Sequence, residues 1–452
     1  MTMGSRAVRG WAQLVLQVGL VLMAAGLVQV VAERTNRRVD LTVARELSLS
    51  EVTRRVLDDV EESMSITVFY ARGQRSRYAG LLSRIRAAAP QVTTELYDLD
   101  RYPERARAMG VSRYGRAVIE YRDRRTVTLA EPEREILGGL LTVLRERAVR
   151  LGFTAGHGER TPAVEPTGYA RLAAALETEG YRIELVPIGA GPVAQEIDLL
   201  VIAGPQLDFA PETAERVRQV LERGNGVLAL LDPHPLPNLS SMLATLGVVV
   251  GDDIVVDHER RVLSSDGLTA VVEFFRRGNP ISEPTSNPIE SGVVLPSART
   301  IDVQPEPGAA GVESIARTGP TAWAMADPDR ARRGAEPTVA AGDRRGPLSL
   351  MVMGEIGSGR LVVIGDADFA SDAYFDLLGN GRLALNAVAW TAREDRLTGE
   401  RNLDVPEVQR PLSPLVVTVD VARRLFVAIV IVQPALVLVL GLIVVGVWRR
   451  RG

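Results

Sequence analysis

The acidic turn in residues 362–380 holds the side chains that could most directly do chemistry. Asp366 and Asp368 follow an apolar run, and Asp372 comes four residues later. In a phosphotransferase of the strand–Asp-x-Asp type, Asp366 would be the nucleophile and Asp368 the acid. Such an enzyme also needs a cation, usually lysine, to hold the phosphoryl group, and here an arginine would have to replace it. The favoured interpretation is architectural: Asp366 and Asp368 accept hydrogen bonds from turn amides, and Ser371 or Asp372 caps the next helix.

The same turn does not fit a calcium loop, but it can still line a binding site. A loop of the EF-hand type needs oxygen ligands at alternate positions and a glycine at the sixth, where Ala370 and Ser371 stand. Ligands nevertheless favour the carboxyl edge of open α/β sheets, which is where a turn after an apolar strand lies. We therefore expect Asp366, Asp368 and Asp372 to be candidate ligand-binding or crevice-lining residues, without a catalytic role.

A second candidate is the stretch "AGHGER", which contains His157 and Glu159. The pair could do acid–base work or bind a metal, but two ligands do not make a metal site, and His234 is the only plausible third. The favoured interpretation is a glycine-rich strand-to-helix turn in which His157 bonds locally and the pair at most lines a crevice. We expect no metal and no cofactor. A serine nucleophile is not expected either, because Ser358 in "GEIGSGR" lies in what reads as a hairpin turn.

Composition excludes several classes of chemistry. The chain has 452 residues, enough for two or three domains. It contains no cysteine, which excludes disulfides, thiolate nucleophiles and cysteine-ligated metals. All 53 basic residues are arginine, which removes a lysine Schiff base and the lysine of a phosphate-binding P-loop. The net charge of −3, with acidic and basic residues interspersed, gives no sign of a nucleic-acid surface.

Two uncharged segments near the ends of the chain predict membrane helices. Residues 11–32 form 22 positions without a charge, and residues 425–448 form 24. At ~1.5 Å per residue, each exceeds the ~30 Å hydrocarbon core of a bilayer. We expect transmembrane helices at 11–32 and 424–448; the first is read as an uncleaved anchor, with a cleaved signal peptide as the alternative. Because arginines 449–451 follow the second span, both termini are expected in the cytoplasm, and the soluble bulk outside the bacterial cytoplasmic (inner) membrane.

Between the spans, the apolar runs predict two domains. Residues 33–63 are read as a linker and a helix that Ser48 or Ser50 can cap. Residues 64–130 read as strand, helix, strand, helix and hairpin, the order of a thioredoxin-like domain, here without the redox cysteine pair. In residues 131–397, short apolar runs alternate with helices, which indicates an α/β domain with a parallel sheet covered on both faces. Within it, residues 257–345 are read as an irregular insertion, and residues 398–422 follow as the linker back to the membrane.

Three stretches, set between the two apolar ends, carry a resemblance to a known family: "RRVDLTVARELSLSEVTRRVL", "FTAGHGER" and "VVIGDADFASDAYFDLLGN". Their order and spacing resemble the gliding-motility-type auxiliary component of ABC transporters over almost the whole chain. The resemblance implies a membrane-anchored accessory subunit that works with an ABC permease and a cytoplasmic ATPase. It also implies a larger soluble domain with the class I glutamine-amidotransferase (flavodoxin-like) fold, here without the nucleophilic cysteine. Members of the family are not limited to gliding cells, so motility is not assumed.

We therefore expect a non-catalytic auxiliary subunit whose extracytoplasmic domains bind the permease, a transported substrate or an envelope partner. ATP hydrolysis is expected in a separate ATPase subunit. The lipid bilayer is the other expected partner, and nucleic acid is not one. Two alternatives remain open: a membrane-tethered hydrolase that uses Asp366, Asp368 and His157, and a stand-alone envelope scaffold or sensor that acts without a transporter.

Overall fold

The computed structural model describes residues 49–257, 268–281, 292–304, 311–332 and 338–399. The predicted membrane segments and most of the linkers next to them lie outside these ranges. Within the described ranges, no helix combines the length and the apolar character that a bilayer crossing requires. The described residues form a mixed α/β structure with parallel strands, as the sequence predicts.

A four-stranded sheet comes first along the chain. Its order is β2-β1-β3-β4, with β1 and β2 parallel and the other neighbours antiparallel. The strands are β1 (Met64–Tyr70), β2 (Val92–Asp98), β3 (Arg116–Tyr121) and β4 (Arg124–Leu129). The helices that follow β1, β2 and β4 are α3 (Arg75–Ala88), α4 (Pro103–Ala108) and α5 (Glu133–Leu144). Mostly β-branched and aromatic residues form β1, because such side chains pack well on a pleated, buried surface.

The helix that leads into this sheet, α2 (Glu51–Asp58), begins at one of the two serines predicted to cap it. The Ser50 hydroxyl accepts the Thr53 N–H at 3.2 Å. Glu133, at the start of α5, accepts the Ser50 N–H at 2.9 Å and the Thr53 hydroxyl at 2.6 Å. Glu133 therefore fastens the first turn of α2 to α5, since these donors have no partner within the helix itself.

An eight-stranded sheet follows, in the order β12-β15-β18-β19-β8-β7-β5-β6. Its parallel strands are β5 (Arg150–Thr154), β6 (Arg182–Val186), β7 (Leu199–Ala203), β8 (Gly226–Leu230) and β19 (Gly359–Ile364). Its antiparallel strands are β18 (Ser349–Ile356), β15 (Glu313–Arg317) and β12 (Phe274–Phe275). All residues of β7, β8 and β19 are buried. Burial on both faces is the reason why β7 and β8 read as continuous apolar runs.

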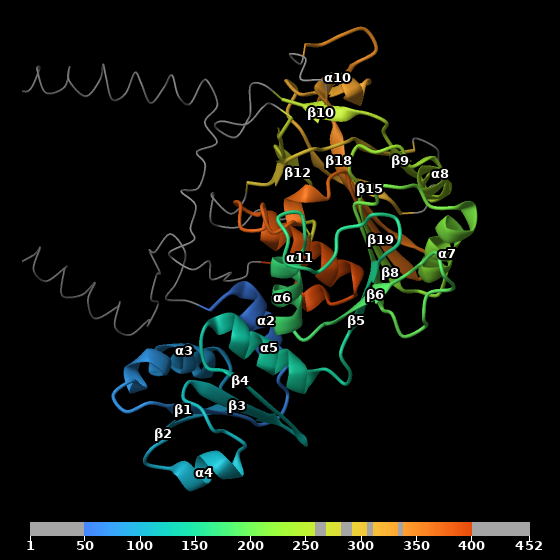
Figure 1. Cartoon of the computed structure of the whole chain (residues 1–452). Helices are drawn as coiled ribbons and strands as arrows, with labels where there is room; N and C mark the ends of the chain where they lie inside the picture. Colours follow the sequence, from blue (N-terminus) through green and yellow to red (C-terminus); the bar gives the residue numbers. More distant parts are fainter. Residues whose placement is uncertain (1–48, 258–267, 282–291, 305–310, 333–337, 400–452) are drawn as a thin grey trace, which may run out of the picture. The chain divides into compact units, whose positions relative to one another are not determined.

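Helices cover both faces of this sheet. On one face, α6 (Ala170–Thr178) and α11 (Asn380–Thr391) share an apolar core with α5 and α2. On the other face, α7 (Pro211–Glu222) and α8 (Pro237–Thr245) form a second core. Figure 1 shows the sheet between these two helix layers.

The segment read as an insertion contributes short strands. Two of them, β12 and β15, extend the large sheet at its antiparallel edge. The others form small sheets with one another or with strands that precede the segment. β16 (Trp323–Met325) pairs with the preceding β10 (Ile254–Val256) and with β17 (Arg344–Arg345), and β11 (Ala270–Val271) pairs with β13 (Val294–Leu295). β14 (Ile301–Val303) pairs with β9 (Val248–Val250), and α10 spans Pro328–Arg332. After this segment, a two-residue turn joins β18 to β19 and contains Ser358, as the hairpin interpretation predicts.

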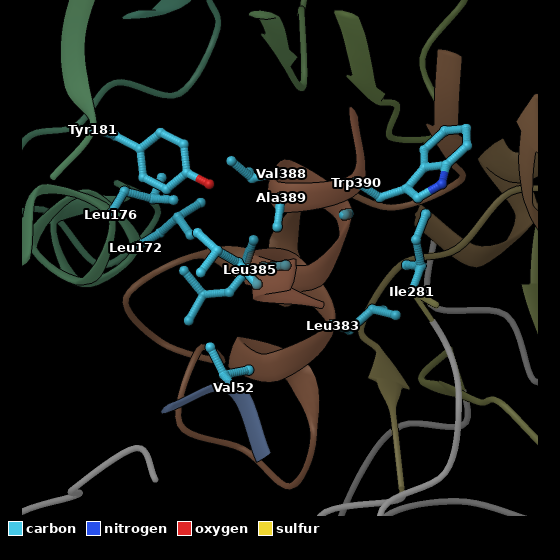
Figure 2. Close-up of a cluster of buried hydrophobic side chains, with 14 of the residues drawn as sticks. Val52, Leu172, Leu176, Tyr181, Ile281, Leu383, Leu385, Val388, Ala389 and Trp390 are labelled. Carbon is cyan, nitrogen blue, oxygen red and sulfur yellow. The ribbon is translucent and has the colours of Figure 1, made fainter. Parts of the chain in front are cut away.

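The helix α11 is buried on every side. All of its 12 residues are buried, including Arg382 and Asn386. Figure 2 shows side chains around it that come from distant parts of the chain, among them Val52 of α2, Leu172 of α6 and Ile281 of the insertion. A helix without a solvent-facing side requires such cover all round.

Two asparagines attach chain segments to α11. The Asn386 side chain donates to the Ile281 carbonyl at 3.2 Å and accepts the Gly399 N–H at 3.0 Å. The Asn380 side chain accepts the Val294 N–H and donates to the Val294 carbonyl, both at 3.0 Å. The insertion and the end of the described chain are therefore both held by this one helix.

Candidate functional site

The parallel strands of the large sheet end at a common edge, where four charged residues meet. β8 and β19 are paired in register, and Asp232 and Asp366 each stand two residues beyond the end of their strand. The turn after β5 brings Arg160 to the same edge, where its backbone N–H donates to the carbonyl of the last residue of β7 at 2.8 Å. We call Arg160, Asp232, Asp366 and Asp368 the carboxyl-edge cluster.

Arg160 bridges two carboxylates of the cluster. Its Nη1 lies 2.6 Å from Asp232 Oδ2, and its Nη2 lies 2.5 Å from Asp368 Oδ1. The exposed fraction is 11% for the Arg160 side chain, 4% for Asp232 and 25% for Asp368. In a place with so little water, each charge depends on its partner, because an unpaired buried charge is costly.

The backbone around this bridge is closely fitted. Gly204 has φ +63°, and a Cβ added there would lie 1.9 Å from Arg160 Nη1, so a side chain would displace the guanidinium. Ala367 is held on both of its backbone groups: its N–H donates to Asp232 Oδ1 at 2.8 Å, and its carbonyl accepts the Tyr169 hydroxyl at 2.5 Å. The turn after β19 is thereby fixed to the ends of β8 and to the start of α6.

Asp366 is fully buried and bound by backbone amides. Its Oδ1 accepts the Phe369 N–H and its Oδ2 accepts the Ser297 N–H, both at 2.7 Å. The Ser297 hydroxyl donates to Asp368 Oδ2 at 3.1 Å. The role expected from the sequence, that of satisfying turn amides, is seen for Asp366, whereas Asp368 binds a guanidinium and a hydroxyl.

Arg299 ties the insertion to this edge of the sheet. Its Nη1 donates to the carbonyls of Asp232 at 2.9 Å and His234 at 2.7 Å, and its Nε donates to the Gly251 carbonyl at 2.6 Å. Its own N–H donates to the Gly365 carbonyl at 2.7 Å. Burial lowers the pKa of Arg299, which is only 2% exposed.

The carboxylates of the cluster outnumber its guanidinium. Burial, and then repulsion from Asp232 and Asp368, raises the pKa of Asp366 well above the usual value of an aspartate. Burial also raises the pKa of Asp232, with Arg160 acting in the opposite direction. Burial alone would lower the pKa of Arg160, but Asp232, Tyr169 and Asp368 raise it above its usual value. The Ser297 and Phe369 N–H groups act in the opposite direction on the pKa of Asp366, because they bind its ionised form.

His157 and Glu159 form a local pair in the turn after β5. Glu159 Oε2 accepts the His157 N–H at 2.6 Å, and Oε1 lies 3.4 Å from Nδ1 of the ring. The ring packs against Phe209, with 4.4 Å between the ring centroids. Among the residues that the structure describes, no group of three or more histidine, aspartate or glutamate side chains could hold a metal ion.

Asp372 acts on a different helix from the one predicted. Its Oδ1 accepts the Arg171 N–H at 2.7 Å, in the first turn of α6, and its own N–H donates to the Gly168 carbonyl at 2.8 Å. The prediction that Ser371 or Asp372 caps the next helix is wrong, because α11 begins after Gly379 without a side-chain cap. Asp372 instead caps a helix 201 residues earlier in the chain, which no local pattern reveals.

Sequence reasoning missed four residues of this edge: Arg160, Asp232, Ser297 and Arg299. A signal for Asp232 is present, since it follows the apolar run of β8 in the same way that Asp366 follows that of β19. Ser297 and Arg299 belong to the insertion, where nothing local indicates which strand ends they meet.

A cavity of ≈ 350 Å³ lies elsewhere, between β14, β15 and β18. Its lining is mixed in charge and includes Asp302, Glu313, Arg317, Ser314 and Ser349, with no residue of the carboxyl-edge cluster. The two serine hydroxyls are 2.7 Å apart and bind each other. The cavity is therefore separate from the residues that the sequence singles out.

Residues 148–393, more than half of the chain, match the family described as "ABC-type uncharacterized transport system". This range contains the whole carboxyl-edge cluster. No curated protein matches the sequence.

Several solved structures are similar to part of the chain. The "mmIFT52 N-terminal domain" is 19% identical, with a TM-score of 0.41, and the match covers 54% of this chain and 97% of that one. A putative thua-like protein from Parabacteroides merdae is 12% identical, with a TM-score of 0.35 and coverage of 58% and 94%. A beta-galactosidase from Bacillus circulans sp. alkalophilus is 10% identical, with a TM-score of 0.32 and coverage of 60% and 34%. Similarity at this level carries no argument about fold or function.

Removal of Asp232 should destabilise the protein far more than removal of Asp368. Asp232→Ala leaves the buried Arg160 guanidinium and the Ala367 N–H without this partner, and breaking a buried ion pair from one side costs ~3–5 kcal/mol. Asp368 is 25% exposed, so water can replace it and the expected loss is ~1 kcal/mol. Urea unfolding of the full chain in mild detergent measures the loss in free energy of unfolding for each variant. Equal losses would contradict the greater structural importance of Asp232.

The raised pKa of Asp366 predicts that stability falls as pH rises. The folded protein keeps a proton that the unfolded chain releases above ~4, so the free energy of unfolding declines from that pH up to the folded-state pKa. Asp366→Asn cannot titrate and should lose this part of the slope, whereas Asp368→Asn, which removes only one of the charges that raise the pKa of Asp366, should reduce the slope less. Urea unfolding at a series of pH values from about 4 to about 8 tests this. Asp232 also has a raised pKa and leaves a smaller slope of the same sign, so a slope in Asp366→Asn as large as in the natural chain would contradict the raised pKa of Asp366.

Proposed function

The chain belongs to the family described as an ABC-type uncharacterized transport system, and from this premise we propose that it is a non-catalytic auxiliary subunit of an ABC transporter. The predicted spans at 11–32 and 424–448 anchor it in the bacterial cytoplasmic membrane, with both termini in the cytoplasm. The domains between them lie outside and bind the permease, a transported substrate or an envelope partner. Gliding motility is not part of the proposal.

The main support for a non-catalytic role is that the side chains of the carboxyl-edge cluster are already bound to one another or to backbone amides. Open α/β sheets place ligands and reactive groups at this edge. Here Arg160 pairs with both Asp232 and Asp368, and both oxygens of the fully buried Asp366 accept backbone N–H groups. A nucleophile has to reach its substrate. The arrangement therefore supports an architectural cluster over the membrane-tethered hydrolase.

The composition supports a separate site of ATP hydrolysis. P-loop ATPases use a lysine to bind the phosphates of the nucleotide, and this chain contains no lysine. The energy for transport would therefore come from a cytoplasmic ATPase subunit, and this chain would act through binding alone.

The finer fold assignments belong to the same proposal. For residues 64–130, the strand order β2-β1-β3-β4 with the hairpin β3–β4 supports a thioredoxin-like domain that, without cysteine, serves as a structural or binding module. For residues 131–397, the parallel order β6-β5-β7-β8-β19 corresponds to the 2-1-3-4-5 order of flavodoxin-like sheets. This order supports the class I glutamine-amidotransferase-like fold.

The full-length chain, purified from its native membrane in mild detergent, should bring an ABC permease and an ATPase with it in a stable ratio. Identification of every partner by mass measures this, and an unrelated membrane protein with the same affinity tag is the control. ATPase activity should follow the ATPase subunit and be missing from the isolated chain. Recovery of the chain alone, or only with other envelope proteins, would refute the transporter role.

A further inference from the structure

The first and the last segments of the described chain lie side by side. η2 (Asp395–Leu397) follows α11 and lies against α2. Arg396 Nη1 is 3.0 Å from Asp59 Oδ2, next to the end of α2, and the Arg55 guanidinium donates to the Thr398 carbonyl. Residues 50–59 at the beginning and 395–399 at the end are therefore in direct contact.

The contact is fixed to the core as well. The Gly399 N–H donates to Asn386 in the middle of α11 at 3.0 Å, and a Cβ on Gly399 would lie 3.4 Å from Glu51 Oε2. Val52 of α2 packs into the core around α11 (Figure 2). We call α2, η2 and residues 398–399 the exit junction, and it is part of the packed structure rather than a loose end.

The exit junction belongs to one side of the large sheet. α2 shares its core with α6 and α11, whereas α7 and α8 pack on the opposite face. Packed layers lie ~10 Å apart, so roughly 20 Å separates the two outer helix layers. A bilayer that lies against one of these faces is therefore clearly closer to the helices of that face than to those of the other.

Short stretches of sequence connect the exit junction to the predicted spans. They are residues 33–48 on one side and 400–423 on the other. Even as random coils, chains of 16 to 24 residues have an end-to-end distance of only ~20–30 Å. Both connections start from the same point, and at its average length neither can pass around the protein to the opposite face. They therefore keep this point close to the bilayer.

We propose that the surface around the exit junction is the membrane-proximal face of the protein and that the lipid bilayer is what it faces. The α7–α8 face then points away from the membrane and is the one open to an envelope partner. This inference rests on the proposed anchoring by the two spans, and it adds an orientation that the anchoring alone does not give.

Site-directed labelling tests the orientation, because the natural chain contains no cysteine. Arg54→Cys on α2 and Ser241→Cys on α8 place one nitroxide label each at an exposed helical position. The full-length variants are placed in nanodiscs that contain nickel-chelating headgroup lipids, with nanodiscs of ordinary lipid as the control. Relaxation of the label by nickel should be several-fold stronger at Arg54→Cys than at Ser241→Cys.

The possible outcomes distinguish a failure of the membrane-proximal face from a failure of the anchoring by the two spans. Nickel relaxation that is equal at the two sites, or stronger at Ser241→Cys, overturns the membrane-proximal face and leaves the anchoring intact. A chain that does not enter nanodiscs at all overturns the anchoring and, with it, the face. Stronger relaxation at Arg54→Cys supports both.

Discussion

The pairing of Arg160 with the buried Asp232 and the partly buried Asp368 is the interaction on which the carboxyl edge depends. It joins the turn after β5 to the turns after β8 and β19, at distances of 2.6 Å to Asp232 and 2.5 Å to Asp368. Without this guanidinium, three carboxylates would face one another where there is little water to screen them. In many α/β proteins these strand ends frame an active site. Here the charged side chains at the strand ends bind one another.

A single buried helix connects this edge to the opposite end of the strands. α11 follows the turn that contains η1 (Asp368–Ala370) and, with 12 residues, is ~18 Å long. At its C-terminal end, Arg360 from the start of β19 donates to the Trp390 carbonyl at 2.8 Å and pairs with Asp395 of η2. The cluster at one end and the exit junction near the other are therefore attached to the same rigid element.

The sequence predicts the elements better than the contacts between them. The buried strands β7 and β8 follow from their continuous apolar runs, and the Ser50 cap follows from the residue types around it. Asp366 and Asp368 are found because they come directly after an apolar strand. Their partners are not found, since Arg160 is 208 residues from Asp368 in sequence and pairs with it only through the fold. Asp372 is misassigned for the same reason.

The central claim is that the carboxyl-edge cluster stabilises an accessory subunit and does no chemistry. Calorimetric titration of the full-length chain in detergent with Mg²⁺ and with Mn²⁺ tests it most directly, because a hydrolase built on these aspartates would need free carboxylate oxygens for the metal. The account predicts no stoichiometric binding, since Arg160 and backbone amides already bind those oxygens. Tight binding of one ion per chain that is lost in Asp366→Ala would contradict it.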